Sequence, residues 1–165
     1  FDEDDFQVEV LETVRVPKSE VKLEEAKVVI SLGLGVLRDA SGRPRNPREA
    51  YELAKQLADL IREKFGVETE IGASRALIYA ELKELEGLIT KDRQVGQTGK
   101  TIAPDVYIAL GISGALQHRV GMQRSKKIIA VNVDPNAPIF QIAHYGYVGD
   151  LYEFLPKAIE ILRSM

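Results

Sequence analysis

The chain has 165 residues, 45% of them apolar, which is enough for one domain with a single sizeable core. Its 22 basic and 25 acidic residues are interspersed and leave a net charge of −3, which argues against a nucleic-acid-binding surface or a polybasic membrane patch. No apolar run approaches the roughly 20 residues that a membrane span needs. There is no cysteine, which excludes disulfides, thiolate catalysis and cysteine metal sites and is typical of an intracellular protein.

The first residues read as an extension ahead of the domain. The chain begins at Phe1 without a methionine, and an acidic run leads into Phe6–Val16. The alternating apolar and polar residues of that segment predict a half-exposed edge strand. We expect residues 1–26 to be a linker and edge strand from a missing upstream domain, and residues 27–165 to form the domain itself.

From residue 27 onward, short apolar runs alternate with segments of helical periodicity. Lys27–Leu32 is a continuous β-branched run, as expected of a strand buried on both faces, and a loop over Gly33–Pro47 follows it. The helix predicted at Arg48–Phe65 has one apolar face and ends at Gly66. Further strands are predicted at Val67–Ile71, Val106–Leu110, Lys127–Val131 and Ile139–Ala143, and further helices at Ser74–Leu85, Gly114–Val120 and Leu151–Leu162. The alternation predicts an α/β fold with a mainly parallel sheet that helices cover on both faces.

Polar residues follow the predicted strands at the point where each strand ends. They are Ser74 and Arg75 after Val67–Ile71, Ser113 after Val106–Leu110, Asn132 after Lys127–Val131, and Asp150 after Ile139–Ala143. Open parallel sheets bind their ligands outside the carboxyl ends of the strands. A row of polar side chains along this edge suits a long ligand with several polar groups better than a compact one.

The stretch from Gln94 to His118 is the strongest candidate for a ligand site. Its first part, Gln94–Lys100, is a loop with two glycines and no large apolar side chain, and it leads through the strand at Val106–Leu110 into Gly111–Gly114. A strand that enters a helix through Gly-Ile-Ser-Gly lets a ligand approach the backbone and directs free N–H groups at it. A phosphate group is the usual ligand of such a segment.

Each candidate also has a purely structural interpretation. Ser74, Ser113 and Asp150 stand at predicted helix starts, where capping is the commoner role. Arg75 and Lys100 would ordinarily be solvated, and Asn132 would form a turn before Asp134 and Pro135. His118 has no acidic partner three or four residues away, so a metal site is not indicated.

Two glycine motifs lack the residue spacing of the nucleotide-binding motifs that they resemble. Gly33-Leu-Gly35 follows a buried strand, but Arg38 stands where the dinucleotide fingerprint needs its third glycine. Gly96-Gln-Thr-Gly-Lys100 lacks the P-loop spacing and precedes a strand instead of following one. Neither a nicotinamide signature nor a nucleotide-hydrolysing loop is therefore indicated.

Several motifs, in the same order, closely resemble the carboxy-terminal FAD-binding domain of the electron transfer flavoprotein alpha subunit. They are IGASR at Ile71–Arg75, QVGQTGK at Gln94–Lys100, APDVYIALGISGALQH at Ala103–His118, NVDPNAPIF at Asn132–Phe140 and YGYVGD at Tyr145–Asp150. The resemblance runs from about Lys27 to the end of the chain. It implies an α/β fold with a three-layer, doubly wound, mainly parallel sheet of the Rossmann-like kind, one non-covalent FAD and a beta-subunit partner.

The resemblance also implies roles for individual residues. Arg75 and His118 match the residues beside the isoalloxazine, with His118 directed at flavin O2, where a cation raises the reduction potential. Thr98, with its neighbour Gln97, matches the contact to flavin N5. Ser113 matches the ribityl and pyrophosphate region, whereas Asn132 and Asp150 match contacts toward the adenosine half. The full set of cofactor-binding residues expected on this basis is Ser74, Arg75, Gln94, Val95, Gly96, Gln97, Thr98, Gly111, Ser113, Gly114, Gln117, His118, Asn132 and Asp150.

The resemblance favours an electron carrier over an enzyme. Its flavin would take electrons from a donor dehydrogenase, such as an acyl-CoA dehydrogenase, and pass them to an electron transfer flavoprotein–quinone oxidoreductase in the membrane. We expect the protein to be cytoplasmic, or in the mitochondrial matrix if its source is eukaryotic. Two alternatives stay open: an alpha subunit of an electron-bifurcating flavoprotein that oxidises NADH, and a dinucleotide-binding domain without redox cycling.

Overall fold

The computed structural model describes residues 22–96 and 101–165, and the strand expected at Phe6–Val16 lies outside them. Five strands form one parallel sheet in the order β3-β2-β4-β5-β6. Their bounds are Val28–Leu32 for β2, Thr69–Ala73 for β3, Val106–Leu110 for β4, Lys127–Asn132 for β5 and Tyr145–Val148 for β6. The predicted parallel α/β sheet is confirmed.

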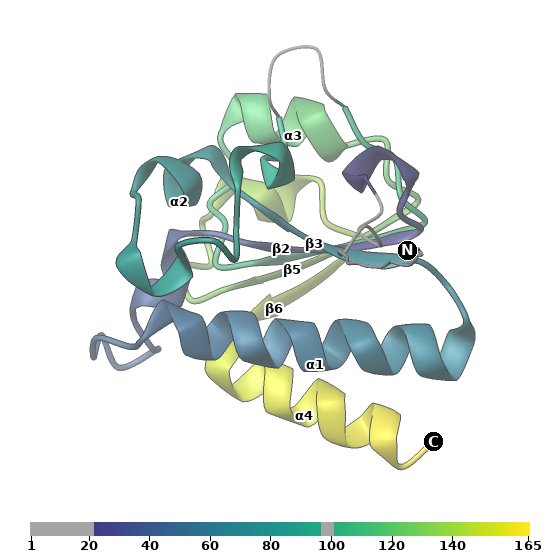
Figure 1. The fold of residues 1–165 in the computed structure, drawn as a ribbon. Coiled ribbons are helices and arrows are strands. Elements are labelled where there is room, and N and C mark those ends of the chain that lie inside the picture. Colours follow the sequence, from purple (N-terminus) through teal and green to yellow (C-terminus); the bar gives the residue numbers. More distant parts are fainter. Residues whose placement is uncertain (1–21, 97–100) are drawn as a thin grey trace, which may run out of the picture.

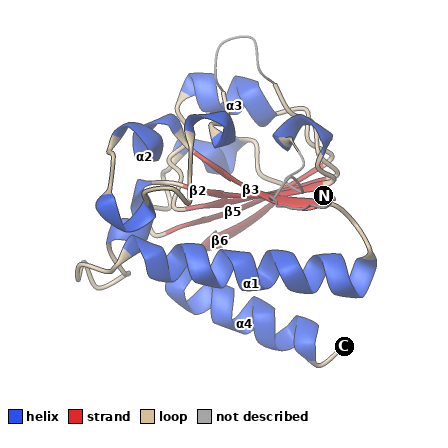
Figure 2. Cartoon of the chain, viewed as in Figure 1, coloured by secondary structure: helices blue, strands red, loops and turns tan. Residues whose placement is uncertain are grey.

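Helices cover both faces of the sheet, which gives the three layers that Figures 1 and 2 show. The helices are α1 at Pro47–Phe65, α2 at Arg75–Tyr79, α3 at Leu116–Met122 and α4 at Leu151–Arg163. Short 3₁₀ turns lie at Leu23–Glu25, Leu34–Leu37, Lys83–Leu85, Lys91–Arg93 and Pro138–Gln141. α1 and α4 pack side by side against one face, and α3 lies over the other.

The two faces of β2 illustrate how the core is divided. Val28, Ile30 and Leu32 belong to the core under α1 and α4, whereas Val29 belongs to the core on the α3 side. Because successive side chains of a strand point to opposite faces, a strand that is buried on both needs apolar residues without a break. All five residues of β2 are buried, as the continuous apolar run predicted.

α1 begins one residue before the predicted Arg48 and ends at the predicted Phe65. The Asn46 side chain accepts a hydrogen bond from the Arg48 backbone N–H, and Pro47 occupies the first helical position, where its missing N–H removes no helical bond. At the other end Gly66 has a φ of 66°, a left-handed conformation that favours glycine. The chain then reverses into β3.

Four predicted elements differ in the structure: α3, which begins later than predicted, and three others. The helix predicted at Ser74–Leu85 stops at Tyr79, because Glu81 has a φ of 50° and breaks the helical path before the turn at Lys83–Leu85. The strand predicted at Val67–Ile71 begins two residues later and continues to Ala73. The strand predicted at Ile139–Ala143 is wrong: this segment is the turn at Pro138–Gln141, and the strand is the following β6.

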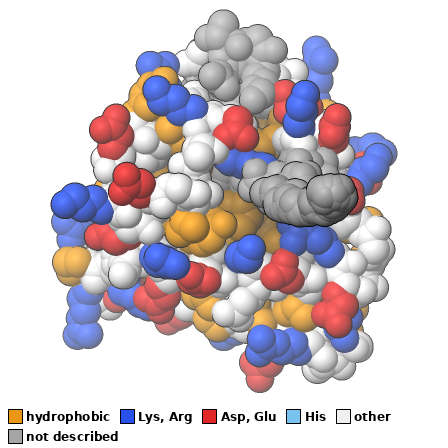
Figure 3. Space-filling model, in the orientation of Figure 1, with side chains coloured by type: hydrophobic (Ala, Val, Ile, Leu, Met, Phe, Trp, Pro, Cys, Tyr) orange, Lys and Arg blue, Asp and Glu red, His pale blue; other side chains and the backbone are white. Residues whose placement is uncertain are grey.

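The surface agrees with a chain of mixed charge. Figure 3 shows acidic and basic side chains intermixed on one face of the molecule, without a continuous basic stripe on that face. Within residues 22–96 and 101–165, no helix combines the length and the apolarity that a membrane span needs.

Candidate functional site

The site lies where the chain leaves the two central strands in opposite directions. From β2 the chain crosses to β3 on one side, and from β4 it crosses to β5 on the other. Neighbouring strands whose connections diverge in this way open a crevice at their carboxyl ends, which is the usual ligand position in doubly wound sheets. The sheet order therefore places a binding crevice between Gly33 and Gly111.

Glycines let the two diverging loops meet. The backbone N–H groups of Gly33 and Gly35 donate to the carbonyl oxygens of Leu110 and Gly111, each over 2.9 Å. A Cβ atom on Gly35 would lie 2.6 Å from Gly111 Cα, and Gly111 itself has a φ of 67°. A side chain at either position would push the loops apart, so the glycines define the floor of the crevice.

Two adjoining hollows make this crevice an elongated cleft. The larger has a volume of about 470 Å³ and the other about 370 Å³, and both are bordered by Leu34, Gly35, Gly111 and Asn132. Volumes of this size are typical of small-molecule sites. Of the expected cofactor-binding residues, the larger hollow brings together Ser74, Arg75, Val95, Gly96, Gly111, Ser113, Gly114, Gln117, His118 and Asn132, and the smaller adds Asp150.

Three expected residues remain, and only one of them, Gln94, lies in the described part of the chain. Gln94 is buried and pairs beside Ala73 at the end of β3, so it supports the wall rather than facing the hollow. Gln97 and Thr98 lie outside the residues that the structure describes.

Ser74 and Arg75 form one wall of the larger hollow. The Ser74 hydroxyl accepts a hydrogen bond from the Leu77 backbone N–H over 3.3 Å, which confirms its capping role at the start of α2. Arg75 is exposed, and its guanidinium lies 5.0 Å from the centre of the Tyr79 ring. This cation–π contact positions a positive charge at the border of the cleft.

Val95 and Gly96 belong to the opposite wall of the larger hollow and join it to β3. The Val95 backbone N–H donates to the Ala73 carbonyl over 2.9 Å, which continues the pairing of β3. Gly96 has a φ of 87°, and a Cβ atom there would lie 2.6 Å from the Gln117 carbonyl oxygen. The glycine thus lets this loop lie directly against α3.

Ser113 and Gly114 stand before α3 rather than within it. The helix begins at Leu116 instead of Gly114, and Ser113 does not cap it, so that prediction was wrong. Gly114 has a φ of 89° and packs against the backbone of Ile139, whose N–H donates to the Ser113 carbonyl over 2.8 Å. A residue in this conformation cannot continue a right-handed helix, which explains the later start.

Two polar side chains remain available along this wall. The side-chain groups of Ser113 and Gln117 have no hydrogen-bond partner among the described residues, and both border the larger hollow. Asn132 differs, because its side chain donates to the Ile112 carbonyl and accepts from the Asp134 N–H, each over 2.9 Å. The expected turn role of Asn132 is confirmed.

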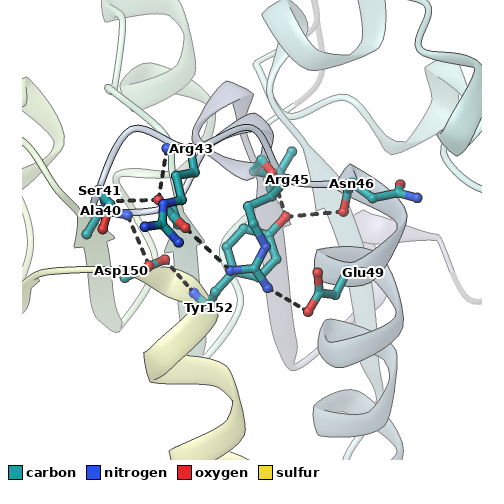
Figure 4. Close-up of polar contacts among 10 residues, drawn as sticks. Ala40, Ser41, Arg43, Arg45, Asn46, Glu49, Asp150 and Tyr152 are labelled. Atoms are coloured by element: carbon teal, nitrogen blue, oxygen red, sulfur yellow. Dashed lines mark hydrogen bonds and ion pairs between the residues drawn. The ribbon is translucent and has the colours of Figure 1, made fainter.

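Asp150 organises the smaller hollow (Figure 4). One carboxylate oxygen accepts from the Tyr152 N–H over 2.9 Å and caps α4, as predicted; the other accepts from the Ala40 N–H over 3.0 Å. The Tyr152 hydroxyl in turn donates to the Val36 carbonyl over 2.5 Å. Burial, with the Glu49 carboxylate nearby, raises the pKa of Tyr152 to about 12, so this hydroxyl stays a donor. Asp150 and Tyr152 together hold the loop that walls the smaller hollow.

His118 is the most enclosed titratable residue of the cleft. It is 6% exposed, and its Nε2 lies 2.7 Å from the Tyr107 hydroxyl. Burial lowers the pKa of His118 to about 4, which favours the neutral ring at pH 7. Its Nδ1 is buried without a hydrogen-bond partner among the described residues.

Sequence reasoning missed Tyr107 and the loop around Ala40. Tyr107 is fully buried in β4, within a run that reads as apolar. A buried tyrosine hydroxyl needs a polar partner, so this residue type was the available signal. For the Ala40 loop, which borders the smaller hollow, no such signal existed.

Comparisons with known proteins identify the family. A family model described as "Electron transfer flavoprotein FAD-binding domain" matches residues 22–123. The chain is 43% identical over 163 residues to the electron transfer flavoprotein subunit alpha of Thermoanaerobacterium thermosaccharolyticum, which covers 99% of this chain and 43% of the relative.

Two further relatives agree. The acryloyl-CoA reductase electron transfer subunit beta of Anaerotignum propionicum is 42% identical, over 98% of this chain and 39% of the relative. The mitochondrial electron transfer flavoprotein subunit alpha of Dictyostelium discoideum is also 42% identical, over 93% of this chain and 38% of the relative. The chain thus spans about two fifths of the length of these relatives. By its family match and these identities, the chain belongs to the FAD-binding domain family of electron transfer flavoprotein alpha subunits.

Proposed function

We propose that the cleft between β2 and β4 binds FAD and that the protein carrying this chain is an electron carrier. The observation that supports this most strongly is the elongated cleft at the switch point, which gathers eleven of the fourteen expected cofactor-binding residues from separate segments. A compact substrate would not need two adjoining hollows. An extended dinucleotide with rings at both ends matches that shape.

The polar groups of the cleft fit such a cofactor. Ser113 and Gln117 offer side-chain hydrogen-bond groups without partners in the described part of the chain, and His118 offers a buried nitrogen in the same condition. A buried polar atom without a partner is costly, and a ligand that bonds to it removes that cost. Arg75 would face the flavin ring system, whereas Asn132 and Asp150 border the end assigned to the adenosine half.

The chain's own residues would set the electrostatics of the site. Bound there, the flavin would accept and release electrons, and the protein would bind it, orient it and tune its potential. The positive charge of Arg75 favours added electron density on a nearby ring. Since His118 is neutral at pH 7, it contributes a hydrogen bond rather than a second charge.

The partners of the whole protein are part of the same proposal. A beta subunit of an electron transfer flavoprotein would complete the complex, a dehydrogenase such as an acyl-CoA dehydrogenase would donate electrons, and a membrane quinone oxidoreductase would receive them. The name of one relative, an electron transfer subunit of acryloyl-CoA reductase, supports a redox partner that acts on acyl-CoA thioesters.

Absorbance tests this function. The protein carrying this chain, purified with its beta subunit, should be yellow, bleach with dithionite and recover in air. An acyl-CoA dehydrogenase with its substrate should also bleach it, and NADH alone should not. A colourless protein that binds ADP-ribose or NAD without cycling would refute the proposal, and bleaching by NADH would indicate the electron-bifurcating alternative.

A further inference from the structure

The contact between Tyr107 and His118 joins a central strand to the wall of the cleft. Tyr107 lies in β4 and is completely buried, and its hydroxyl oxygen is 2.7 Å from His118 Nε2. The two rings are tilted by 60° with their centres 6.0 Å apart, so the contact runs through the polar atoms rather than through stacking. His118 belongs to α3 and borders the larger hollow.

The protons of this pair can be assigned from its surroundings. Burial raises the pKa of the Tyr107 hydroxyl well above its usual range, so the phenol keeps its proton and must donate it. The Ser31 hydroxyl on the neighbouring strand makes no hydrogen bond of good geometry among the described residues, and it lowers the Tyr107 pKa, as a donor to the phenol oxygen does. The acceptor for the Tyr107 proton is therefore His118 Nε2. A nitrogen that accepts carries no proton, so the single proton of the neutral ring lies on Nδ1.

This assignment makes Nδ1 of His118 a hydrogen-bond donor. It is buried and has no hydrogen-bond partner in the described part of the chain, on a residue that borders the cleft. An N–H donor buried without a partner is destabilising, and a ligand acceptor would offset that cost.

We infer that Tyr107 is a positioning residue: by donating to His118 Nε2 it fixes the ring in the tautomer that offers an Nδ1–H donor to the bound cofactor. The identity of the acceptor, an electron-rich oxygen of the flavin ring system, rests on the proposed function; the tautomer does not. A hydrogen bond strengthens as its acceptor becomes more negative, so an uncharged donor here favours the reduced cofactor without adding a fixed charge.

The chain carries an internal reference for the opposite tautomer. It has two histidines, and His144 Nδ1 accepts a hydrogen bond from the Ile128 backbone N–H over 2.9 Å. Neutral His144 must therefore hold its proton on Nε2. A spectrum of the ring nitrogens should show both tautomers, one for His118 and the other for His144.

Nitrogen-15 NMR of histidine-labelled protein at pH 8, freed of flavin, tests the inference. We expect His118 as the Nδ1–H tautomer and His144 as the Nε2–H tautomer in the unmodified protein. In Tyr107→Phe the Nδ1–H population of His118 should fall while His144 stays unchanged. Tyr145→Phe, which removes an exposed hydroxyl on β6, should change neither ring.

Two results would overturn the inference: His118 as the Nε2–H tautomer in the unmodified protein, or the same His118 tautomer population in Tyr107→Phe. The first measurement needs no variant, so a Tyr107→Phe protein that fails to fold does not remove the test. With flavin bound, Tyr107→Phe should lower the midpoint potential, and no further lowering should follow in a His118→Gln background. Absence of flavin binding would refute the proposed function and leave the tautomer result standing.

Discussion

The Asp150 carboxylate accepts a hydrogen bond from the Tyr152 N–H at the start of α4 and another from the Ala40 N–H, 110 residues earlier in the chain. Asp150 is 7% exposed, so both of its oxygens are used inside the protein. One side chain therefore caps the start of a helix and also shapes the wall of the smaller hollow, so its capping and site roles are not separate.

Replacing Asp150 should reveal both roles. Asp150→Ala removes a helix cap and leaves the Ala40 N–H unsatisfied, so we expect a loss of about 2–3 kcal/mol in the free energy of unfolding. Asp150→Asn keeps an oxygen for the cap but turns an amide donor toward Ala40, and should lose about half as much. Urea unfolding measures both. Asn46→Ala, which removes only the α1 cap, is the control, and an equal loss in Asn46→Ala and Asp150→Ala would contradict the dual role.

A methyl group at Gly111 should disturb the floor of the cleft. Gly111→Ala strains a φ of 67° and places a Cβ atom 2.8 Å from Gly35 Cα, so we expect a loss of more than about 2 kcal/mol. Gly42→Ala is the matched control, because Gly42 has a φ of 82° but open space around it. Gly42→Ala should lower the free energy of unfolding only by the cost of a left-handed backbone conformation, about 1 kcal/mol. Equal losses by urea unfolding would mean that the contact with Gly35 is unimportant.

The buried pair Arg93–Glu70 should stabilise the loop that enters the site. Arg93 Nη1 lies 3.0 Å from Glu70 Oε1, and both residues are 7% exposed. Glu70→Ala leaves the buried guanidinium without this partner, so we expect a loss of about 3 kcal/mol in thermal or urea unfolding. Asp59→Ala removes an exposed ion pair with Arg62 and should cost less than about 1 kcal/mol. Comparable losses in Glu70→Ala and Asp59→Ala would show that the buried pair stabilises the fold no more than the exposed pair does.

Stability should depend on pH through His118. Its pKa is about 4 in the folded protein, below the ordinary value of 6.5, so between these values the unfolded chain binds a proton that the folded chain does not. The full stability is present above pH 6.5 and declines as the pH falls toward 4, by up to about 1.4 kcal/mol per pH unit. His118→Gln should lose this part of the slope. Identical slopes in urea unfolding between pH 4.5 and 6.5 would contradict the assignment.

Local chemistry made much of the fold predictable. Gly66 marks the end of α1 because a left-handed φ depends on adjacent residues only, whereas the cap at Asn46 and the first helical residue Pro47 lie in the segment predicted as the preceding loop. The buried strands were predictable because continuous apolar runs bounded by glycine suit few other environments. The strand predicted at Ile139–Ala143 was wrong because the sequence pattern of a short apolar run does not distinguish a strand from a buried turn.

The site was only partly predictable for a related reason. Residues after the strands could be placed at one edge, because parallel strands end together. The start of α3 could not, since the left-handed conformation of Gly114 goes with its packing against Ile139, a tertiary contact. The bond between Tyr107 and His118 likewise depends on how α3 lies over β4, and no spacing rule expresses that geometry.

The most direct test of the central claim is the affinity for FAD of two tryptophan variants, measured by fluorescence titration of the flavin-free protein with its beta subunit. Leu34 is 44% exposed and borders both hollows, whereas Phe65 is 53% exposed at the far end of α1. If the cleft between β2 and β4 holds the flavin, Leu34→Trp should bind FAD at least about tenfold more weakly, a change of about 1.4 kcal/mol, and Phe65→Trp should bind it as the unmodified protein does. Unchanged affinity in Leu34→Trp would contradict the claim.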